Sequence, residues 1–315
     1  GVHVPELLDQ ARPGTEFSDR YYIVITRAEG FDLAWLAPAC RLGLEPGSDE
    51  HLSAAENAFL NACIDKGRIP ARILLAALSS LTSVFDTLHT AQFSLGNVDA
   101  SGVIWNDVKP EHIFWNPRAG EITIIDWGNS RLLETGGASR DMRHTAADDL
   151  RQLIDEMGRF LEQAAPDLFS LLEWPSQPLT ASLNETVAVL RERIAAALRK
   201  ENAELDKTRR EEEELIQPGP HPEEAVERLI QVHQRLIALG ELPDNAAALR
   251  LASASVANLA AAADLPAVEK LCAWAATLPD APAAQWRLLA RLASAAARER
   301  EDAREHPALL QRRVG

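Results

Sequence analysis

The sequence predicts an α+β fold, and three observations indicate it. Short β-branched and aromatic runs, which are typical of strands, occur in the first part of the chain. Residues 69–91 have helical spacing and are apolar over much of the circumference, which indicates a helix at the centre of a core. Beyond residue 222 the chain is rich in alanine and leucine and nearly free of strand signals, so a second, all-helical region is expected.

The first strand signals lie near the amino terminus. Residues 3–8 are short and apolar, and YYIVI (21–25) is β-branched and aromatic, as in a buried strand. Gly30 permits a turn, and helical spacing follows over 50–65 and 69–91. Residues 113–115 and 122–125 then predict two short strands, which the turn NPRAGE between them would bring side by side.

The remainder of the chain predicts helices. DDLRQLIDEMGRFLEQ (148–163) has one apolar face, and the charge run KENAELDKTRREEEEL (200–215) is predicted to be a solvated helix or linker. Leu-Pro pairs near expected helix boundaries beyond residue 222 indicate helical hairpins in series or an ordinary helical bundle. The predicted organisation is a domain at 1–198, a charged linker at 199–221 and a helical module at 222–315.

Composition narrows the class of protein. The 315 residues are 46% hydrophobic, as in a globular protein, and the net charge of -15 argues against nucleic acid as a partner. The three cysteines lack the short spacings of zinc or disulfide frameworks and are expected to be buried thiols. Without a signal peptide or an apolar stretch of membrane-spanning length, we expect a cytoplasmic protein that contacts no membrane.

The stretch GVIWNDVKPEHIFWNPRAGEITIIDWG (102–128) carries the candidate chemistry. Lys109 follows Asp107 by two residues, so extended backbone would point both side chains the same way. Asp126 ends the second predicted strand, and Gly128 is expected to give the freedom for a sharp turn. A proton-accepting carboxylate, a positive charge and a metal-binding carboxylate are the groups that phosphoryl transfer requires.

WNDVKPEHIFW followed by ITIIDWG resembles the catalytic loop and the metal-binding motif of protein kinases, H-R-D-x-x-x-x-N and D-F-G. The resemblance covers roughly residues 3–195 and implies a kinase-like C-lobe. It implies that Asp107 and Lys109 are catalytic and that Asp126 holds Mg²⁺, with Mn²⁺ as an alternative. ATP would be the phosphate donor, and Lys109 resembles the lysine of Ser/Thr protein kinases, which implies a protein substrate.

YYIVITRAEGFDLAWL is similar to the last N-lobe strand and hinge of that family. By this resemblance Ile25 is at the gatekeeper position, and the backbone of Thr26 and Ala28 would meet adenine. Asp32 would lie near the ribose, and Phe114 would lie beneath the adenine.

Asp149 resembles the buried aspartate that braces the catalytic loop, with Asp148 as the competing choice. His112 stands where the family has the asparagine that binds a second metal. Imidazole suits softer metals better than Mg²⁺, so His112 is expected either to bind a metal such as Mn²⁺ or to hydrogen-bond Asp107. Asn106 replaces the arginine that meets an activation-loop phosphate, so control by such phosphorylation is not expected.

Other departures from the family leave three hypotheses open. A Gly-rich loop, a strand lysine and a helix glutamate are not found, so we expect the chain to begin inside the N-lobe and to bind nucleotide weakly. The first hypothesis is a Ser/Thr protein kinase with a helical module for protein partners. The second is a small-molecule kinase of the aminoglycoside or choline type, favoured by Trp127 and by the short segment 126–149. The third is a pseudokinase that acts as an interaction scaffold, favoured by His112 and Asn106.

Overall fold

The structure, a computed structural model, describes most of the chain. The described residues are 2–3, 6–11, 22–44, 52, 54–95, 98–134, 145–175, 182–216, 222–262, 264–278 and 281–305. They form an α+β structure that is mostly helical with a few small sheets, so the predicted class is confirmed. The chain divides into two compact units. The first comprises 1–204 and 238–241, and the second comprises 205–237 and 242–315.

All the strands belong to the first unit within the described part of the chain. They are β1 (Val2–His3), β2 (Leu7–Ala11), β3 (Tyr22–Ile25), β4 (Phe31–Asp32), β5 (Phe93–Leu95), β6 (Val98–Ile104), β7 (Ile113–Asn116), β8 (Glu121–Ile124) and β9 (Arg131–Glu134). Its helices are α1 (Leu33–Leu42), α2 (Ala54–Lys66), α3 (Ala71–Thr90), α4 (Ala146–Gln152), α5 (Gly158–Ala164) and α6 (Pro166–Leu171). Short 3₁₀ turns η1 (Pro110–His112) and η2 (Trp127–Asn129) precede β7 and β9, and the π-helical η3 (Leu153–Met157) joins α4 to α5.

The predicted hairpin is confirmed as the antiparallel pair β7–β8, with Ile113 opposite Ile124 and Trp115 opposite Ile122. These four residues are buried and alternate with less buried ones, the period of two that places one sheet face against a core. The sheet order is β1-β8-β7-β4. The hairpin therefore fixes where the chain enters β7 and where it leaves β8.

A second sheet, β5-β6-β9, includes the strand that precedes Asp107 and the strand that follows Asp126. Ile104, at the end of β6, is paired with Arg131, at the start of β9. The chain leaves β6 toward Asp107, and it enters β9 from η2, directly after Asp126. This register is the reason why two segments about twenty residues apart in sequence meet.

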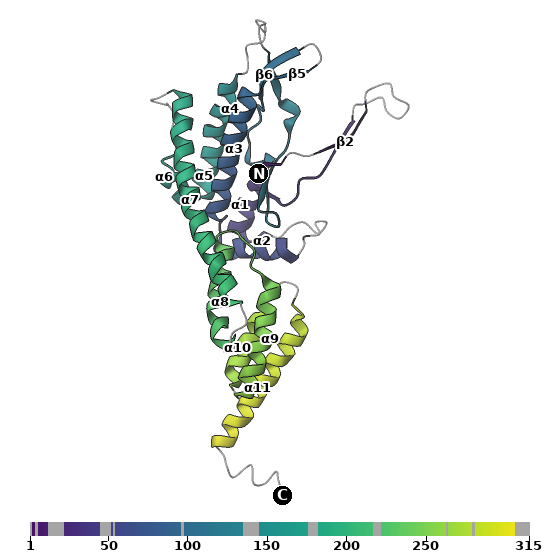
Figure 1. Cartoon of the computed structure of the whole chain (residues 1–315), viewed down its shortest axis with the longest axis vertical. Helices are drawn as coiled ribbons and strands as arrows, with labels where there is room; N and C mark the ends of the chain where they lie inside the picture. Colours follow the sequence, from purple (N-terminus) through teal and green to yellow (C-terminus); the bar gives the residue numbers. More distant parts are fainter. Residues whose placement is uncertain are drawn as a thin grey trace. The chain divides into compact units, whose positions relative to one another are not determined.

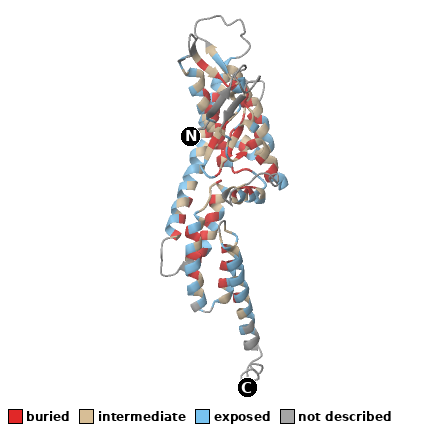
Figure 2. Cartoon of the chain, turned by 90° about the vertical axis from the view of Figure 1, so that its right-hand side faces the viewer, coloured by how far each residue is buried: buried red, intermediate tan, exposed pale blue. Residues whose placement is uncertain are grey.

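Helix α3 is the central helix of the first unit and lies beside α4 and β6 (Figure 1). It also contacts β7 and β8. Nine of its residues are buried, from Arg72 to Phe85, and buried residues gather on the inner faces of this unit (Figure 2). Among the described residues it is the one helix whose length and composition would suit a membrane span, and half of that apolar window is buried inside the fold.

Gly30 precedes β4 with φ +90°, a conformation that L side chains rarely adopt. A Cβ at this position would lie 2.0 Å from the carbonyl oxygen of Trp115. Glycine is therefore required for β4 to approach β7 this closely.

Helices form the second unit in the part of the chain that is described. They are the end of α7 (Leu183–Leu215), α8 (Pro222–Ala238), α9 (Asn245–Ala261), α10 (Leu265–Ala275) and α11 (Ala283–Glu305). Helix α10 packs against both α9 and α11. Asp244 and Asp264 cap the amino termini of α9 and α10, each accepting from a backbone N–H three residues on. The first two Leu-Pro pairs stand at these starts, as predicted, and Pro279 lies outside the described residues.

The charge run 200–215 is not simply solvated, because one face of α7 is buried there. Glu212 is 3% exposed, and its carboxylate accepts from Arg209 (2.8 Å) and from the backbone N–H of Asp244 (2.8 Å), with His233 Nε2 at 3.2 Å. Burial alone would raise the pKa of Glu212, but His233, Asp244 and Arg209 outweigh it and lower the pKa. The predicted helix is confirmed, but its buried face was not predicted, because these partners come from distant parts of the sequence.

The three cysteines, Cys40, Cys63 and Cys272, are free thiols, and all three are buried, as the sequence predicts. Their burial makes them parts of the two cores rather than exposed reactive thiols.

Candidate functional site

The two aspartates of the sequence motif meet in the first unit. Asp107 follows β6, and Asp126 follows β8. One ligand atom each from Asp107, His112 and Asp126 lies within 4.8 Å of the others, a grouping that could hold a metal ion. Two carboxylates and one imidazole suit divalent cations that accept both oxygen and nitrogen ligands.

Asp107 is 8% exposed, and its partners keep it ionised. Lys109 Nζ lies 2.7 Å from Oδ1, and Asn129 Nδ2 donates to Oδ2 at 3.1 Å. Burial on its own would raise the pKa of Asp107, but the hydrogen bonds from Lys109 and Asn129 outweigh burial and lower the pKa. In turn, the hydrogen bond to Asp107 raises the pKa of Lys109. Asp107 is therefore a carboxylate that can accept a proton or a hydrogen bond.

His112 lies between the two aspartates. Its Nδ1 is 3.0 Å from the carbonyl oxygen of Asp107 and 3.8 Å from that residue's carboxylate, while Nε2 is 3.5 Å from Asp126 Oδ2. Because a carbonyl oxygen can only accept, Nδ1 carries a proton. In the neutral ring Nε2 then keeps its lone pair on the side of Asp126, where it could bind a metal.

The backbone at Asp126 is left-handed, with φ 57°. From the sequence we expected Gly128 to provide the unusual backbone conformation of this turn. That expectation is wrong, because Gly128 lies inside η2 and its φ is not positive. A Cβ at Gly128 would make only ordinary contact with Asp126 Oδ1, at 3.4 Å. The indole N–H of the buried Trp105 donates to the carbonyl oxygen of Asp126 at 3.0 Å and helps to hold this strained residue.

Asp149 braces the loop that carries Asp107. Its carboxylate accepts from the backbone N–H of Trp105 (2.9 Å) and of Asn106 (2.6 Å), and His89 Nε2 lies 2.9 Å away. Asp149 is completely buried. The competing residue Asp148 instead joins a capping box with Thr145 at the start of α4.

Asn129, Gln152 and His89 also belong to the site, and sequence reasoning missed them. Gln152 accepts from the backbone N–H of Val108 (2.9 Å) and donates to Asn106 Oδ1 (3.3 Å). Gln152 stands three residues after Asp149 on the same helical stretch, a spacing that could have identified it. His89 and Asn129 have no such local signal, since each reaches the site only through the tertiary fold.

Two of the residues predicted to meet the nucleotide, Asp32 and Phe114, lie at the β4–β7 contact. Asp32 and Phe114 are direct cross-strand partners, and Phe114 stands two residues after His112. Asp32 Oδ1 caps α1 by accepting from the backbone N–H of Trp35 at 2.7 Å. Burial raises the pKa of Asp32, although the Trp35 hydrogen bond opposes the rise.

The predicted hinge lies before β4. The backbone N–H of Thr26 donates to Glu6 O at 2.9 Å, and its hydroxyl accepts from Glu6 N at 2.8 Å. That N–H is therefore engaged in pairing with the amino-terminal segment. Ala28 is half-buried in the same loop, whereas the side chain of Ile25 lies outside what the structure describes.

A groove of about 470 Å³ lies along α1 and α5 and reaches Pro110 in η1. Arg41 and Arg159 line it, and Arg159 is ion-paired with Glu156. Asp107, Lys109, His112 and Asp126 are not among the residues that line this groove.

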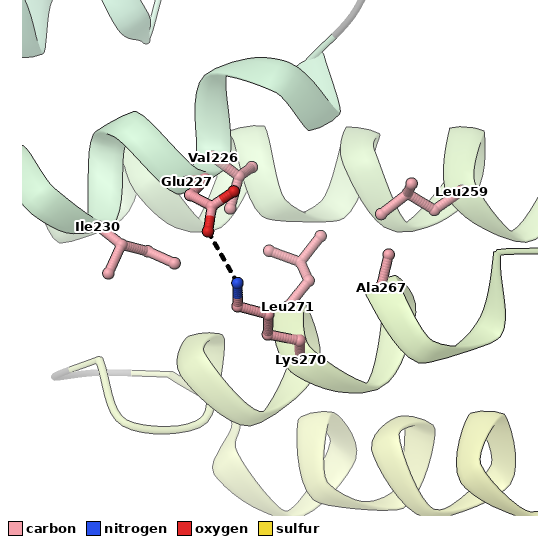
Figure 3. Close-up of a pocket in the computed structure, with 7 residues that line it drawn as sticks. All are labelled: Val226, Glu227, Ile230, Leu259, Ala267, Lys270 and Leu271. Atoms are coloured by element: carbon pink, nitrogen blue, oxygen red, sulfur yellow. Dashed lines mark hydrogen bonds and ion pairs between the residues drawn. The ribbon is translucent and has the colours of Figure 1, made fainter.

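The second unit has its own hollow, of about 210 Å³, among α8, α9 and α10 (Figure 3). Glu227 and Lys270 face one another across it at 2.9 Å, and apolar side chains such as Ile230 and Leu271 line the rest. None of the predicted site residues lines this hollow.

Comparison of the chain with protein-family models, with curated proteins and with solved structures gave no match. The candidate function therefore depends on the residues and geometry of the site.

Proposed function

We propose that the first unit is the catalytic part of an ATP-dependent phosphotransferase with a protein kinase-like C-lobe and hinge, which transfers the γ-phosphate to a serine or threonine hydroxyl of a protein. The observation that carries the proposal is the convergence of Asp107, His112 and Asp126 within 4.8 Å, with Lys109 paired to Asp107. Carboxylates, a nitrogen ligand and a cation at one point are the groups required to position and neutralise a transferring phosphate.

Each residue has a separate role in this proposal. Asp107 would orient the acceptor hydroxyl and accept its proton, which requires the ionised carboxylate that its lowered pKa provides. Lys109 Nζ would neutralise negative charge on the phosphoryl group. Mg²⁺ or Mn²⁺, when bound, would supply charge neutralisation between the phosphates, and Asp126 and His112 are the residues that would hold it.

The arrangement around the site also supports a kinase-like C-lobe. A long buried helix, α3, precedes the loop with Asp107, and a hairpin separates that loop from Asp126. Asp149, on α4, holds this loop by accepting hydrogen bonds from two of its backbone N–H groups. In the proposed assignment adenine would lie at Thr26, Ala28 and Phe114, and ribose near Asp32.

Transfer of labelled γ-phosphate by the native protein tests the proposal. The assay would offer autophosphorylation, a mixture of Ser/Thr peptides and small aminoalcohol acceptors, with Mg²⁺ or Mn²⁺. Asp107→Ala and Asp126→Ala should each reduce transfer at least about 100-fold while the fold survives. Asp167→Ala is the matched control, because its side chain is 94% exposed and its ion pair with Arg68 is long, at 3.7 Å.

The acceptor that is labelled separates the protein kinase from the small-molecule kinase. Absence of transfer by the wild-type protein with either metal contradicts the proposal, as does unchanged transfer in the Asp107 or Asp126 variant.

The observation that favours a non-catalytic interaction scaffold is the imidazole of His112 beside Asp126, since Mg²⁺ prefers an oxygen ligand. Nucleotide-independent capture of a protein partner by the second unit would be the signature of that alternative.

A further inference from the structure

The groove along α1 and α5 (the α1–α5 groove) has two helical walls. Its lining residues recur every three or four positions on α1, and they do so again from η3 into α5. They include Ala34, Ala37 and Arg41 on one wall and Glu156, Arg159 and Gln163 on the other. Each wall is therefore one face of a helix, about two turns long.

Much of the α1–α5 groove is apolar and only partly buried. Ala37 and Pro38 on α1, and Phe160 and Ala164 on α5, each keep part of their surface open to solvent. Alanine and proline side chains are short, so they let a neighbouring helix approach closely, while Phe160 offers a larger apolar contact. The groove, of about 470 Å³, therefore has room for apolar side chains of a third helix.

Pro38 changes the hydrogen bonding of its wall. It lies inside α1 and has no N–H to donate to the carbonyl oxygen of Ala34, four residues earlier. Both residues line the groove. The α1 wall therefore contains a backbone acceptor without its usual helical donor, and a first-turn N–H of a docked helix could use it.

The charges at the groove favour an acidic occupant. Two arginines and one glutamate line it, which leaves one positive charge in excess. Glu156 is ion-paired with Arg159. Arg41, in the last turn of α1, is exposed, and its side chain has neither an ion pair nor a hydrogen bond with the residues that the structure describes. Arg41 is therefore a cation that the described fold leaves available, in a chain whose net charge is -15.

We infer that the α1–α5 groove binds a short acidic amphipathic helix of a partner protein. The apolar face of that helix would pack against Pro38 and Phe160, and a glutamate or aspartate at its edge would pair with Arg41. Two helical walls of similar length fit a helix, their short side chains admit it, and the unpaired arginine selects an acidic edge. The inference goes beyond the proposed function and does not depend on it.

Binding of labelled helical peptides to the full chain, measured by fluorescence anisotropy, tests the inference. The probes are designed peptides of roughly 18 residues, about five helical turns. They share leucines at helical spacing and differ only in the residues beside them, which are glutamate, glutamine or lysine. The glutamate peptide should bind at least about 5-fold more tightly than the other two, because only its charge complements Arg41. A proline at its centre should weaken binding about 10-fold or more.

Variants of the groove separate its charge from its shape. Arg41→Gln should weaken binding of the glutamate peptide about 5-fold, and Arg41→Glu should reverse the preference in favour of the lysine peptide. Ala37→Trp should fill the groove and weaken binding of all three peptides. Thermal unfolding of each variant checks that the fold survives. If the negative charge of Arg41→Glu at the end of α1 prevents folding, Arg41→Gln carries the test of charge.

Arg199→Glu is the matched control, because Arg199 is also exposed on a helix, α7, and is not among the residues that line the groove. It should leave binding of the glutamate peptide within about 2-fold of the wild type, since its charge lies outside the groove.

Four results would overturn the inference. They are absence of binding by the wild type, equal affinity of the wild type for the glutamate and lysine peptides, unchanged binding of the glutamate peptide by Arg41→Gln, and binding that survives the central proline. Sedimentation of the chain without peptide tests the other occupant. A dimer that Ala37→Trp dissociates would place a second copy in the groove and would contradict the acidic partner.

Discussion

The backbone N–H of Asn106 donates to Asp149 Oδ1 at 2.6 Å, and this contact holds a non-glycine residue whose φ is 62°. Such left-handed backbone costs free energy in a residue with a side chain, so it persists only where the surroundings impose it. Asn106 directly precedes Asp107. The orientation of the proposed proton acceptor is therefore set by a buried carboxylate on α4.

Asp149→Asn should destabilise the fold by about 3 kcal/mol, because the carboxylate accepts from two backbone N–H groups and an amide NH₂ cannot replace both of its oxygens. Thermal or urea unfolding measures the loss. Asp148→Asn is the matched neighbour and should cost less than about 1 kcal/mol, since it alters only a helix cap and an exposed ion pair with Arg151. Equal losses in the two variants would show that Asp149 does not brace the loop.

Gly30→Ala should cost at least about 3 kcal/mol, because the added Cβ would collide with the carbonyl oxygen of Trp115 and φ is +90°. Gly128→Ala should cost less than about 1 kcal/mol, since its Cβ would meet Asp126 Oδ1 at an ordinary 3.4 Å. Equilibrium unfolding of the two variants measures this difference. A larger loss for Gly128→Ala would restore the sequence-based idea that Gly128, rather than Asp126, carries the unusual backbone.

Asp32→Ala should lose about 1 kcal/mol of stability, because the Asp32 carboxylate caps α1 through Trp35 N–H. Asp32→Asn keeps an amino-terminal cap and removes a charge that burial disfavours, so its stability should stay within about 0.5 kcal/mol of the wild type. If Asp32 also contacts ribose, both variants should weaken nucleotide binding. Weakened binding in the alanine variant alone would assign the effect to the helix cap.

Lys109→Met should raise the pKa of Asp107, because the hydrogen bond from Lys109 is the strongest of the interactions that lower it against the effect of burial. Carbon-13 NMR of the aspartate carboxyls measures the shift, with exposed Lys66→Met as control. The folded-state pKa of Asp107 lies below its unfolded value of about 3.9, so the stability it contributes is present above about pH 4 and is lost as pH falls through the folded pKa. Lys109→Met should reduce that acid-side loss of stability. An unchanged titration of Asp107 would contradict the ion pair.

Local patterns were sufficient to predict much of the fold. The β7–β8 hairpin was predictable from two short apolar runs with the turn NPRAGE between them. In the structure Gly120, with φ +68°, closes this turn. The central helix α3 follows from apolar residues repeated at helical spacing. These features depend on residues close together in sequence, and such residues carry their own structural preference.

The tertiary contacts of the site were less accessible to sequence reasoning. Adjacent residues such as Asp148 and Asp149 project about 100° apart on a helix, so the packing of α4 against the loop decides which one is buried. Asn129 reaches Asp107 because β6 pairs with β9, and Glu212 is buried where Asp244, before α9, and His233, on α8, approach it. Each of these contacts requires the packing of separate elements to be known.

The most direct test is the location of Mn²⁺ in crystals of the native protein with a non-hydrolysable ATP analogue, from anomalous scattering. We expect an anomalous peak at roughly 2.2 Å from an Asp126 carboxylate oxygen, with the terminal phosphate beside Lys109 and Asp107. The same crystals of Asp126→Asn should lose the peak. A Mn²⁺ peak and nucleotide density located away from Asp107, His112 and Asp126 would contradict the claim that these residues form a phosphoryl-transfer site.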